Sequence, residues 1–206
     1  MEDEFVKILE KTRELSNSFS IRRLSLDEIC RKIGVSKSTL NKYVKNKTEL
    51  VEEALKFERY QFEEIFLVND FEHTNAIDIL FTVSLEVCRR FNQVSPSVTF
   101  DLAKYYPDVY RKHIDNRTEY IFEKIKINIE KGIRQGMYRP DFSIELVARL
   151  YISRLIDIHN PEFFPPEKYS FSLLFEVMFE NFVRSIATTE GMKYFEACKE
   201  TIKFEL

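Results

Sequence analysis

Tryptophan is absent from this 206-residue sequence, and glycine, proline and cysteine occur only four, six and three times. So few glycines and prolines exclude a collagen-like or low-complexity chain and favour an ordered, helix-rich protein. The cysteines are Cys30, Cys88 and Cys198, an odd and widely spaced set that indicates neither a disulfide framework nor a metal site. We therefore expect a protein of the reducing cytoplasm that has no metal and no other cofactor.

Long apolar runs are also missing, because none approaches the roughly 18 residues that a membrane-spanning helix needs. The N-terminal sequence MEDEFVKILEK is acidic and amphipathic, and it lacks the basic start and apolar core of a signal peptide. These absences predict a soluble, intracellular protein that makes no membrane contact.

Charge is unevenly distributed along the chain. The formal net charge is -3, which by itself disfavours nucleic-acid binding. Residues 20–47, however, hold eight Lys and Arg against only Asp27 and Glu28, so this segment carries +6 and the remainder -9. A short basic segment on an acidic body is typical of a DNA-contacting module joined to a part that does not touch DNA.

Helical periodicity extends over the whole chain, and no segment alternates convincingly like a β-strand. We expect an all-α protein of nine or ten helices with these approximate bounds, N-caps included: 2–17, 25–33, 36–44, 46–68, 72–93, 97–105, 107–135, 143–158, 169–187 and 190–204. The length favours two unequal domains. We assign residues 1–47 to a three-helix N-terminal domain and residues 48–206 to a larger helical domain.

The second and third helices have the most specific boundaries. Ser25 and Glu28 form a capping box, in which hydroxyl and carboxylate each accept a free backbone N–H. Gly34 suits the left-handed conformation that ends a helix, and Ser36 is the expected N-cap of the next one. Two short helices joined by a glycine turn form the helix-turn-helix arrangement, which places its second helix in the DNA major groove.

Small polar and basic side chains occupy this second short helix. Lys37, Ser38 and Thr39 lie on its first turn, where side chains reach base edges, and Asn41 and Lys42 follow one turn later. A surface lysine taken alone is more often solvated than base-reading. The spacing, the turn glycine and the local charge together favour DNA contact.

The start of the following long helix suits a phosphate. Tyr43, Lys45 and Lys47 surround it, so that a phenol, two ammonium groups and free backbone N–H groups converge there. Taken alone, Tyr43 is more readily explained as a half-buried packing residue.

The segment from Leu24 to Val51 closely resembles the N-terminal signature of the TetR family of transcriptional regulators. The matching positions are Ile29, Gly34, Val35, Ser36, Lys37, Thr39, Leu40, Tyr43, Lys47, Glu49 and Leu50. The resemblance implies that Lys37, Ser38, Thr39 and Lys42 face the groove and that Tyr43 and Lys47 contact phosphates. Asn41 stands where the family usually has tyrosine, and asparagine can pair with adenine, so we expect an unusual operator.

The family resemblance weakens after residue 50, although Glu130–Leu150 is similar to a common family run. It implies a homodimer in which the helices near 143–158 and 169–187 form a four-helix bundle with their counterparts. A ligand pocket would lie among the central helices, with these candidate lining residues: Phe81, Leu85, Phe100, Tyr106, Tyr110 and Tyr120. The alternative is that these aromatic residues, in a chain with 19 Phe, fill the core.

The function expected from these features is ligand-responsive, sequence-specific binding to double-stranded operator DNA. In its simplest form the protein is a repressor that a small, largely apolar molecule releases from DNA. The alternative is a ligand-independent or architectural DNA-binding protein, and activation in place of repression is also compatible with the sequence. We do not expect an enzyme, because we find no Gly-rich phosphate loop, nucleophile motif, carboxylate dyad or metal cluster.

Overall fold

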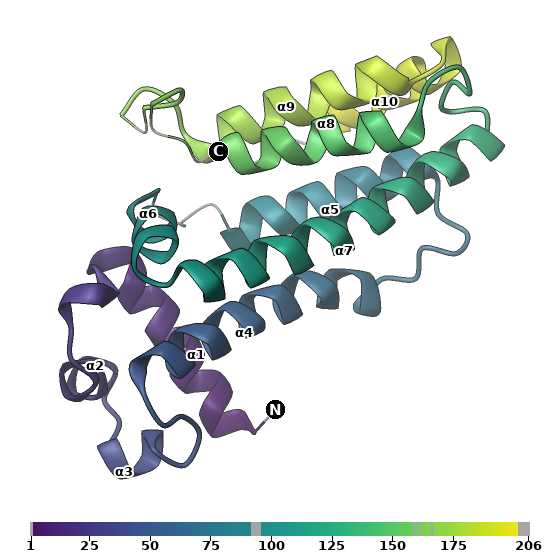
Figure 1. The fold of residues 1–206 in the computed structure, drawn as a ribbon. Coiled ribbons are helices and arrows are strands. Elements are labelled where there is room, and N and C mark those ends of the chain that lie inside the picture. Colours follow the sequence, from purple (N-terminus) through teal and green to yellow (C-terminus); the bar gives the residue numbers. More distant parts are fainter. Residues whose placement is uncertain (1, 92–95, 159, 161, 166, 202–206) are drawn as a thin grey trace. The chain divides into compact units, whose positions relative to one another are not determined.

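The computed structural model describes residues 2–91, 96–158, 160, 162–165 and 167–201. Within these residues the chain forms ten α-helices and one short 3-10 helix, η1 (Figure 1). In chain order they are α1 (Asp3–Ser18), η1 (Ile21–Arg23), α2 (Leu26–Ile33), α3 (Lys37–Leu40), α4 (Lys47–Val68), α5 (Ala76–Phe91), α6 (Pro96–Tyr105), α7 (Pro107–Arg134), α8 (Ile144–Asp157), α9 (Phe171–Ile186) and α10 (Thr189–Thr201). The predicted all-α fold is confirmed.

Two predicted helix boundaries are wrong. Helix α3 ends at Leu40 and not near Val44, because the N–H groups of Lys42 and Tyr43 bond to carbonyls three residues earlier and tighten the chain into turns. Helix α5 begins at Ala76 and not at 72. Two side chains hold the preceding backbone in turns: Asp70 accepts the N–H of Glu72 at 3.0 Å, and Asn75 accepts that of Ile77 at 2.8 Å. The predicted ends at residues 93 and 204 lie outside the described residues.

The chain divides into two compact units. The N-terminal unit consists of Met1–Glu64 and Gln93–Arg117, and the C-terminal unit of Ile65–Asn92 and Thr118–Leu206. Helix α6 and the first turns of α7 therefore belong to the same unit as α1, α2 and α3. The predicted domain boundary after residue 47 stays a prediction.

The core of the N-terminal unit joins its first four α-helices. Its buried side chains are Phe5, Ile8 and Leu9 of α1, Ile29, Cys30 and Ile33 of α2, Leu40 of α3, Val44, and Leu50 and Phe57 of α4. On each longer helix these residues recur every three or four positions, which places them on one face. The core thereby fixes α3 through its last residue and leaves the rest of that helix at the surface.

Three phenylalanines form a cluster in the core of the C-terminal unit. Phe81 of α5, Phe179 of α9 and Phe195 of α10 are fully buried and contact one another, with ring centroids 5.2 to 5.9 Å apart. The ring of Tyr138 covers Gly132 of α7 so closely that a β-carbon there would lie 2.0 Å from a ring carbon. The absence of a side chain at Gly132 therefore allows the chain after α7 to pack against that helix.

All three cysteines lie within the described residues. All three cysteines are free thiols, and Cys30 lies in the core of the N-terminal unit as predicted. Burial raises its pKa, which keeps it in the thiol form.

Among the helices described, none combines the length and the apolar character needed to cross a bilayer.

Candidate DNA-binding site

Helix α2 is fixed at both ends. The hydroxyl of Ser25 accepts the N–H of Glu28 at 3.2 Å, and the Glu28 carboxylate accepts the N–H of Ser25 at 2.7 Å, which confirms the predicted capping box. Gly34 has φ +74°, the predicted left-handed conformation. The ammonium of Lys11 donates to the carbonyl of Ile33 at 3.0 Å. These bonds satisfy backbone groups that a helix leaves unpaired, and they set the direction in which the chain enters α3.

Helix α3 presents a polar surface on an apolar anchor. Ser36 caps it as predicted, since its hydroxyl accepts the N–H of Thr39 at 2.9 Å. Leu40 and Val44 are buried beneath it. Of the predicted base-contacting residues, Thr39 is half-buried, whereas four are exposed: Lys37, Ser38, Asn41 and Lys42. A short helix with exposed polar side chains is the form of a DNA-reading helix.

Lys37 has an intramolecular partner. Its Nζ lies 2.9 Å from Oδ1 of Asp27, on the first turn of α2, and both side chains are more than half exposed. The hydrogen bond to Asp27 raises the pKa of Lys37, so this residue is a cation under physiological conditions. The predicted contact of Lys37 with DNA, which stays a prediction, would compete with Asp27 for the ammonium group.

Tyr43 also has intramolecular partners. Its ring stacks on Phe5 with centroids 4.6 Å apart. Its hydroxyl lies 2.9 Å from a carboxylate oxygen of Glu2 and 2.8 Å from one of Glu4. These contacts raise the pKa of Tyr43 far above its usual range, so the phenol keeps its proton.

Lys47 supports the chain between α1 and α2. Its ammonium donates to the carbonyl oxygens of Arg22 and Leu24, both at 3.0 Å. Both predicted phosphate contacts, Tyr43 and Lys47, thus hold protein partners here, and their role towards DNA stays a prediction.

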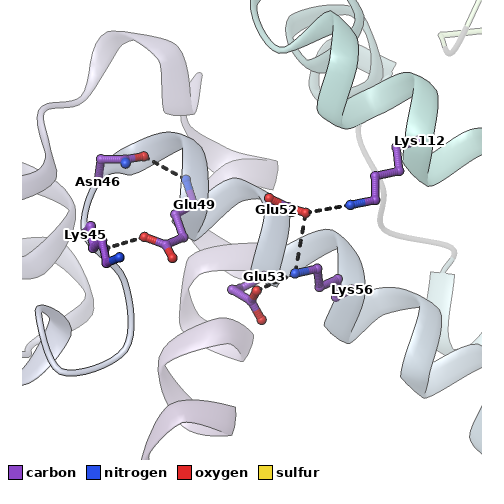
Figure 2. A network of polar contacts seen from close by, with 7 residues as sticks. All are labelled: Lys45, Asn46, Glu49, Glu52, Glu53, Lys56 and Lys112. Carbon is purple, nitrogen blue, oxygen red and sulfur yellow. Dashed lines mark hydrogen bonds and ion pairs between the residues drawn. The ribbon is translucent and has the colours of Figure 1, made fainter.

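The first turn of α4 is capped by side chains (Figure 2). Asn46 accepts the N–H of Glu49 at 2.9 Å, and the Glu49 carboxylate accepts the N–H of Lys45 at 2.6 Å. Figure 2 also shows Lys112 of α7 reaching Glu52 of α4, with an N–O distance of 3.2 Å. Helix α4 is therefore tied both to the helix-turn-helix and to the start of α7, all within the N-terminal unit.

The sequence of this region is similar to that of a known protein family. Residues 8–54, which include α2, α3 and the capped start of α4, match the model of the bacterial regulatory proteins of the tetR family. The helix-turn-helix of this chain is of the TetR type. The match supports DNA binding and transcription regulation, and regulators of the TetR family are in general not enzymes.

Three solved structures share the fold. A TetR transcription regulator from Haloarcula marismortui has a TM-score of 0.73 at 15% identity, covering 91% of this chain and 100% of that one. The fatty acid degradation regulator FadR from Bacillus halodurans has a TM-score of 0.71 at 12% identity, covering 89% and 96%. NemR from E. coli, in its reduced form, has a TM-score of 0.66 at 15% identity, covering 88% and 96%. No curated protein matches this sequence significantly.

The six predicted ligand-binding residues of this chain lie in different surroundings. Phe81 is packed in the C-terminal core and Leu85 is half-buried in α5, whereas Tyr120 packs edge-on against Phe66 in the C-terminal unit. The other three belong to the N-terminal unit: Phe100 is exposed, Tyr110 is half-buried, and Tyr106 lines a cleft. Three of the six thus belong to each unit, and their contact with a ligand stays a prediction.

Sequence reasoning missed the acidic partners of the site. Asp27 is ten residues from Lys37, and Glu2 and Glu4 are about forty residues from Tyr43. The acidic start of the chain carries no local sign of this contact. Its position beside the predicted phosphate contact depends on how α1 packs in the folded unit.

Proposed function

We propose that this protein is a homodimeric repressor that binds a two-fold symmetric operator through α3 and is released by a small molecule. The observation that carries the proposal is the exposed set Lys37, Ser38, Asn41 and Lys42 around the buried Leu40. Side chains that are solvated and lie on a rigidly anchored helix can reach base edges without unfolding their support. The protein would act on DNA in the cytoplasm.

Selection from a random duplex library by the purified protein would test operator binding. We expect an enriched palindrome whose half-sites lie about one helical turn, or a multiple of it, apart. On that duplex, measured by fluorescence anisotropy, Asn41→Ala should reduce discrimination at one base position, whereas Lys42→Ala should also lower the salt slope by about one. Lys193→Ala, at an exposed site of α10, is the matched control. The absence of any enriched sequence would refute the proposal.

The dimer interface is proposed on α8 and α9. Leu146 and Leu150 of α8 are each 62% exposed, and Leu173 and Val177 of α9 are 42% and 52% exposed. Both pairs are spaced by four residues, so each forms an apolar stripe on one helix face. The two helices contact each other in the C-terminal unit. The neighbouring Phe175, Met178, Phe179, Phe182 and Val183 are already buried in the chain, which leaves the exposed stripes for a partner.

Sedimentation velocity would test this interface. Leu150→Glu places a charge in the stripe and should give a monomer that binds the palindrome more weakly, because the two reading heads are no longer linked. Leu67→Glu is the matched control, since Leu67 is 74% exposed on α4. If Leu150→Glu remained a dimer, the assignment of the interface would be wrong.

Release by a ligand is the feature that separates a sensor from a ligand-independent DNA-binding protein. A ligand weakens DNA binding only if it binds the DNA-free state more tightly. Anisotropy of the protein–operator complex, measured at fixed salt against a panel of small apolar molecules, should find compounds that lower operator affinity. If none had an effect at saturation, the ligand-independent alternative would be favoured.

A further inference from the structure

A cleft in the N-terminal unit lies between α1, η1, α4 and α6. Its empty space is about 700 Å³, including the part open to solvent. Val51, Ala54 and Leu55 of α4, with Val98 and Leu102 of α6, supply an apolar wall. A mainly apolar cleft with a few polar groups is the usual form of a small-molecule site.

The polar wall of the cleft is rich in acceptors. Its charged residues are Arg13, Glu58 and Asp101, a formal excess of one negative charge. Arg13 donates to the side-chain oxygen of Gln61 at 2.6 Å. Thr12 and Ser16 of α1 donate their hydroxyl protons to helix carbonyls and so face other groups as acceptors.

The two carboxylates differ in their partners. Glu58 forms an ion pair with Arg117, with 3.6 Å between Oε1 and Nη1. Asp101 is hydrogen-bonded to the neutral hydroxyl of Ser20, and no cation pairs with it within the described part of the chain. Tyr106 lies at the same end of the cleft, where burial and the charge of Asp101 raise its pKa and keep its hydroxyl protonated. A partly buried carboxylate beside apolar walls is stabilised by a cation that also has an apolar body.

We propose that this cleft binds a small amphipathic amine, with its ammonium group on Asp101 and its hydrocarbon part against Val51, Ala54 and Leu102. Such a molecule complements the cleft in three ways. Its ammonium donates to carboxylate and hydroxyl acceptors, and its apolar body leaves water. Its positive charge also offsets the negative excess of the cleft wall.

The position of Asp101 links this site to the DNA-binding helices. Ser20 precedes η1, and η1 is also held by Arg22, whose guanidinium donates to the Tyr105 hydroxyl at 2.6 Å and lies over that ring. Lys47 binds the carbonyls of Arg22 and Leu24, directly before the cap of α2. An ammonium on Asp101 competes with Ser20 and loosens this segment. The regulatory part of the inference, which rests on the proposed function, is that the amine weakens operator binding.

Calorimetry with the full-length protein tests the site directly. The probes are cyclohexylamine, cyclohexanol and cyclohexanecarboxylate, which share a ring and differ in charge at neutral pH. We expect cyclohexylamine to bind at least about tenfold more tightly than the other two, the effect of one charge-assisted hydrogen bond. Equal binding of the alcohol, or tighter binding of the carboxylate, would overturn the proposal.

Substitutions locate the amine. Asp101→Asn removes the charge but retains an acceptor for Ser20, and it should lower cyclohexylamine affinity about tenfold. Asp115→Asn, at an exposed site of α7 outside the cleft, should leave it unchanged. Ala54→Leu places a larger side chain in the space next to the apolar wall and should weaken binding of the cyclohexyl ring. A cooperative thermal unfolding transition would show that this variant is folded. Wild-type affinity in Asp101→Asn would exclude this site.

The same compounds, added to the protein–operator complex, test regulation separately. Cyclohexylamine should lower DNA affinity in the wild type and not in Asp101→Asn. If the wild type bound no operator at all, the proposed function would be wrong. Calorimetry would still show whether the cleft binds the amine. If the operator bound and saturating amine left its affinity unchanged, the regulatory link would be wrong.

Discussion

Asp27 and Lys37 form an ion pair, with 2.9 Å between carboxylate and ammonium, across the turn that joins the two helices of the helix-turn-helix. The pair places a negative charge beside the lysine expected to enter the major groove. Asp27→Asn should therefore tighten operator binding about twofold to fivefold and steepen its salt dependence, because the ammonium is released and the phosphates are no longer repelled. Anisotropy titrations at several salt concentrations measure both. Asp115→Asn controls for net charge, and unchanged affinity in Asp27→Asn would show that the pair does not compete with DNA.

Ser36 separates the stability of α3 from its affinity for DNA. Ser36→Ala removes the acceptor for the N–H of Thr39 and should cost about 1 kcal/mol in the free energy of unfolding. Ser36→Asp retains a capping acceptor but adds a negative charge at the reading surface. We expect it to be nearly as stable as wild type in urea unfolding and to bind the operator more weakly than Ser36→Ala. Equal DNA affinity of the two variants would place Ser36 away from the duplex.

Substitutions of Lys47 and Lys45 should differ in their effects on the free energy of unfolding and on DNA affinity. Lys47 donates to two backbone carbonyls, whereas the side chain of Lys45 is exposed. Lys47→Ala should therefore lower both the free energy of unfolding and DNA affinity, since it leaves the carbonyls of Arg22 and Leu24 without that donor. Lys45→Ala should lower DNA affinity and its salt slope alone. A loss of stability confined to Lys45→Ala would contradict this division of roles.

Much of the helix-turn-helix could be predicted because its determinants are local. Ser25 with Glu28, Gly34, and Ser36 with Thr39 each act within three residues or through a single backbone conformation. Spacing in the sequence therefore suffices to identify them. The all-α class was predictable for the same reason, since helical periodicity is read over adjacent turns.

The partners of the predicted site residues could not be found in this way. Tyr43 meets Glu2 and Glu4, and Ser20 meets Asp101, only because distant segments pack together. The predicted ligand residues could not be divided into core and pocket residues for a related reason, because aromatic side chains at helical spacing occur in both. Phe81, for example, is surrounded by Phe179 and Phe195.

Gly34 tests backbone conformation in isolation. A β-carbon there would meet nothing nearer than the Lys11 ammonium at 4.0 Å, so a substitution costs energy through φ and not through a clash. We expect Gly34→Ala to lower the free energy of unfolding by about 1 to 2 kcal/mol and Gly34→Asn to lower it less, because asparagine tolerates the left-handed region. Urea unfolding measures both. A larger loss in Gly34→Asn than in Gly34→Ala would indicate that side-chain size, and not φ, limits this position.

His113 gives the fold a pH dependence of known sign. It is buried on α7, its Nδ1 has no hydrogen-bond partner within the described part of the chain, and Glu58 lies 4.0 Å from its Nε2. Burial lowers its pKa, Arg117 and Arg59 lower it further, and Glu58 opposes them. The unfolded chain therefore takes up this proton at a higher pH than the folded one. Stability from His113 is fully present above an unfolded pKa of about 6.5 and is lost as the pH falls below it.

Urea unfolding of the wild type and of His113→Gln at pH 7.5 and 5.5 measures this effect. The wild type should lose more stability between the two values than the variant, which has no imidazole to protonate. His73, exposed in the turn before α5, supplies the matched control as His73→Gln, which should behave as the wild type does. If His113→Gln and the wild type lost equal stability, the folded protein would accommodate the charged imidazole, most directly by moving Glu58 closer to it.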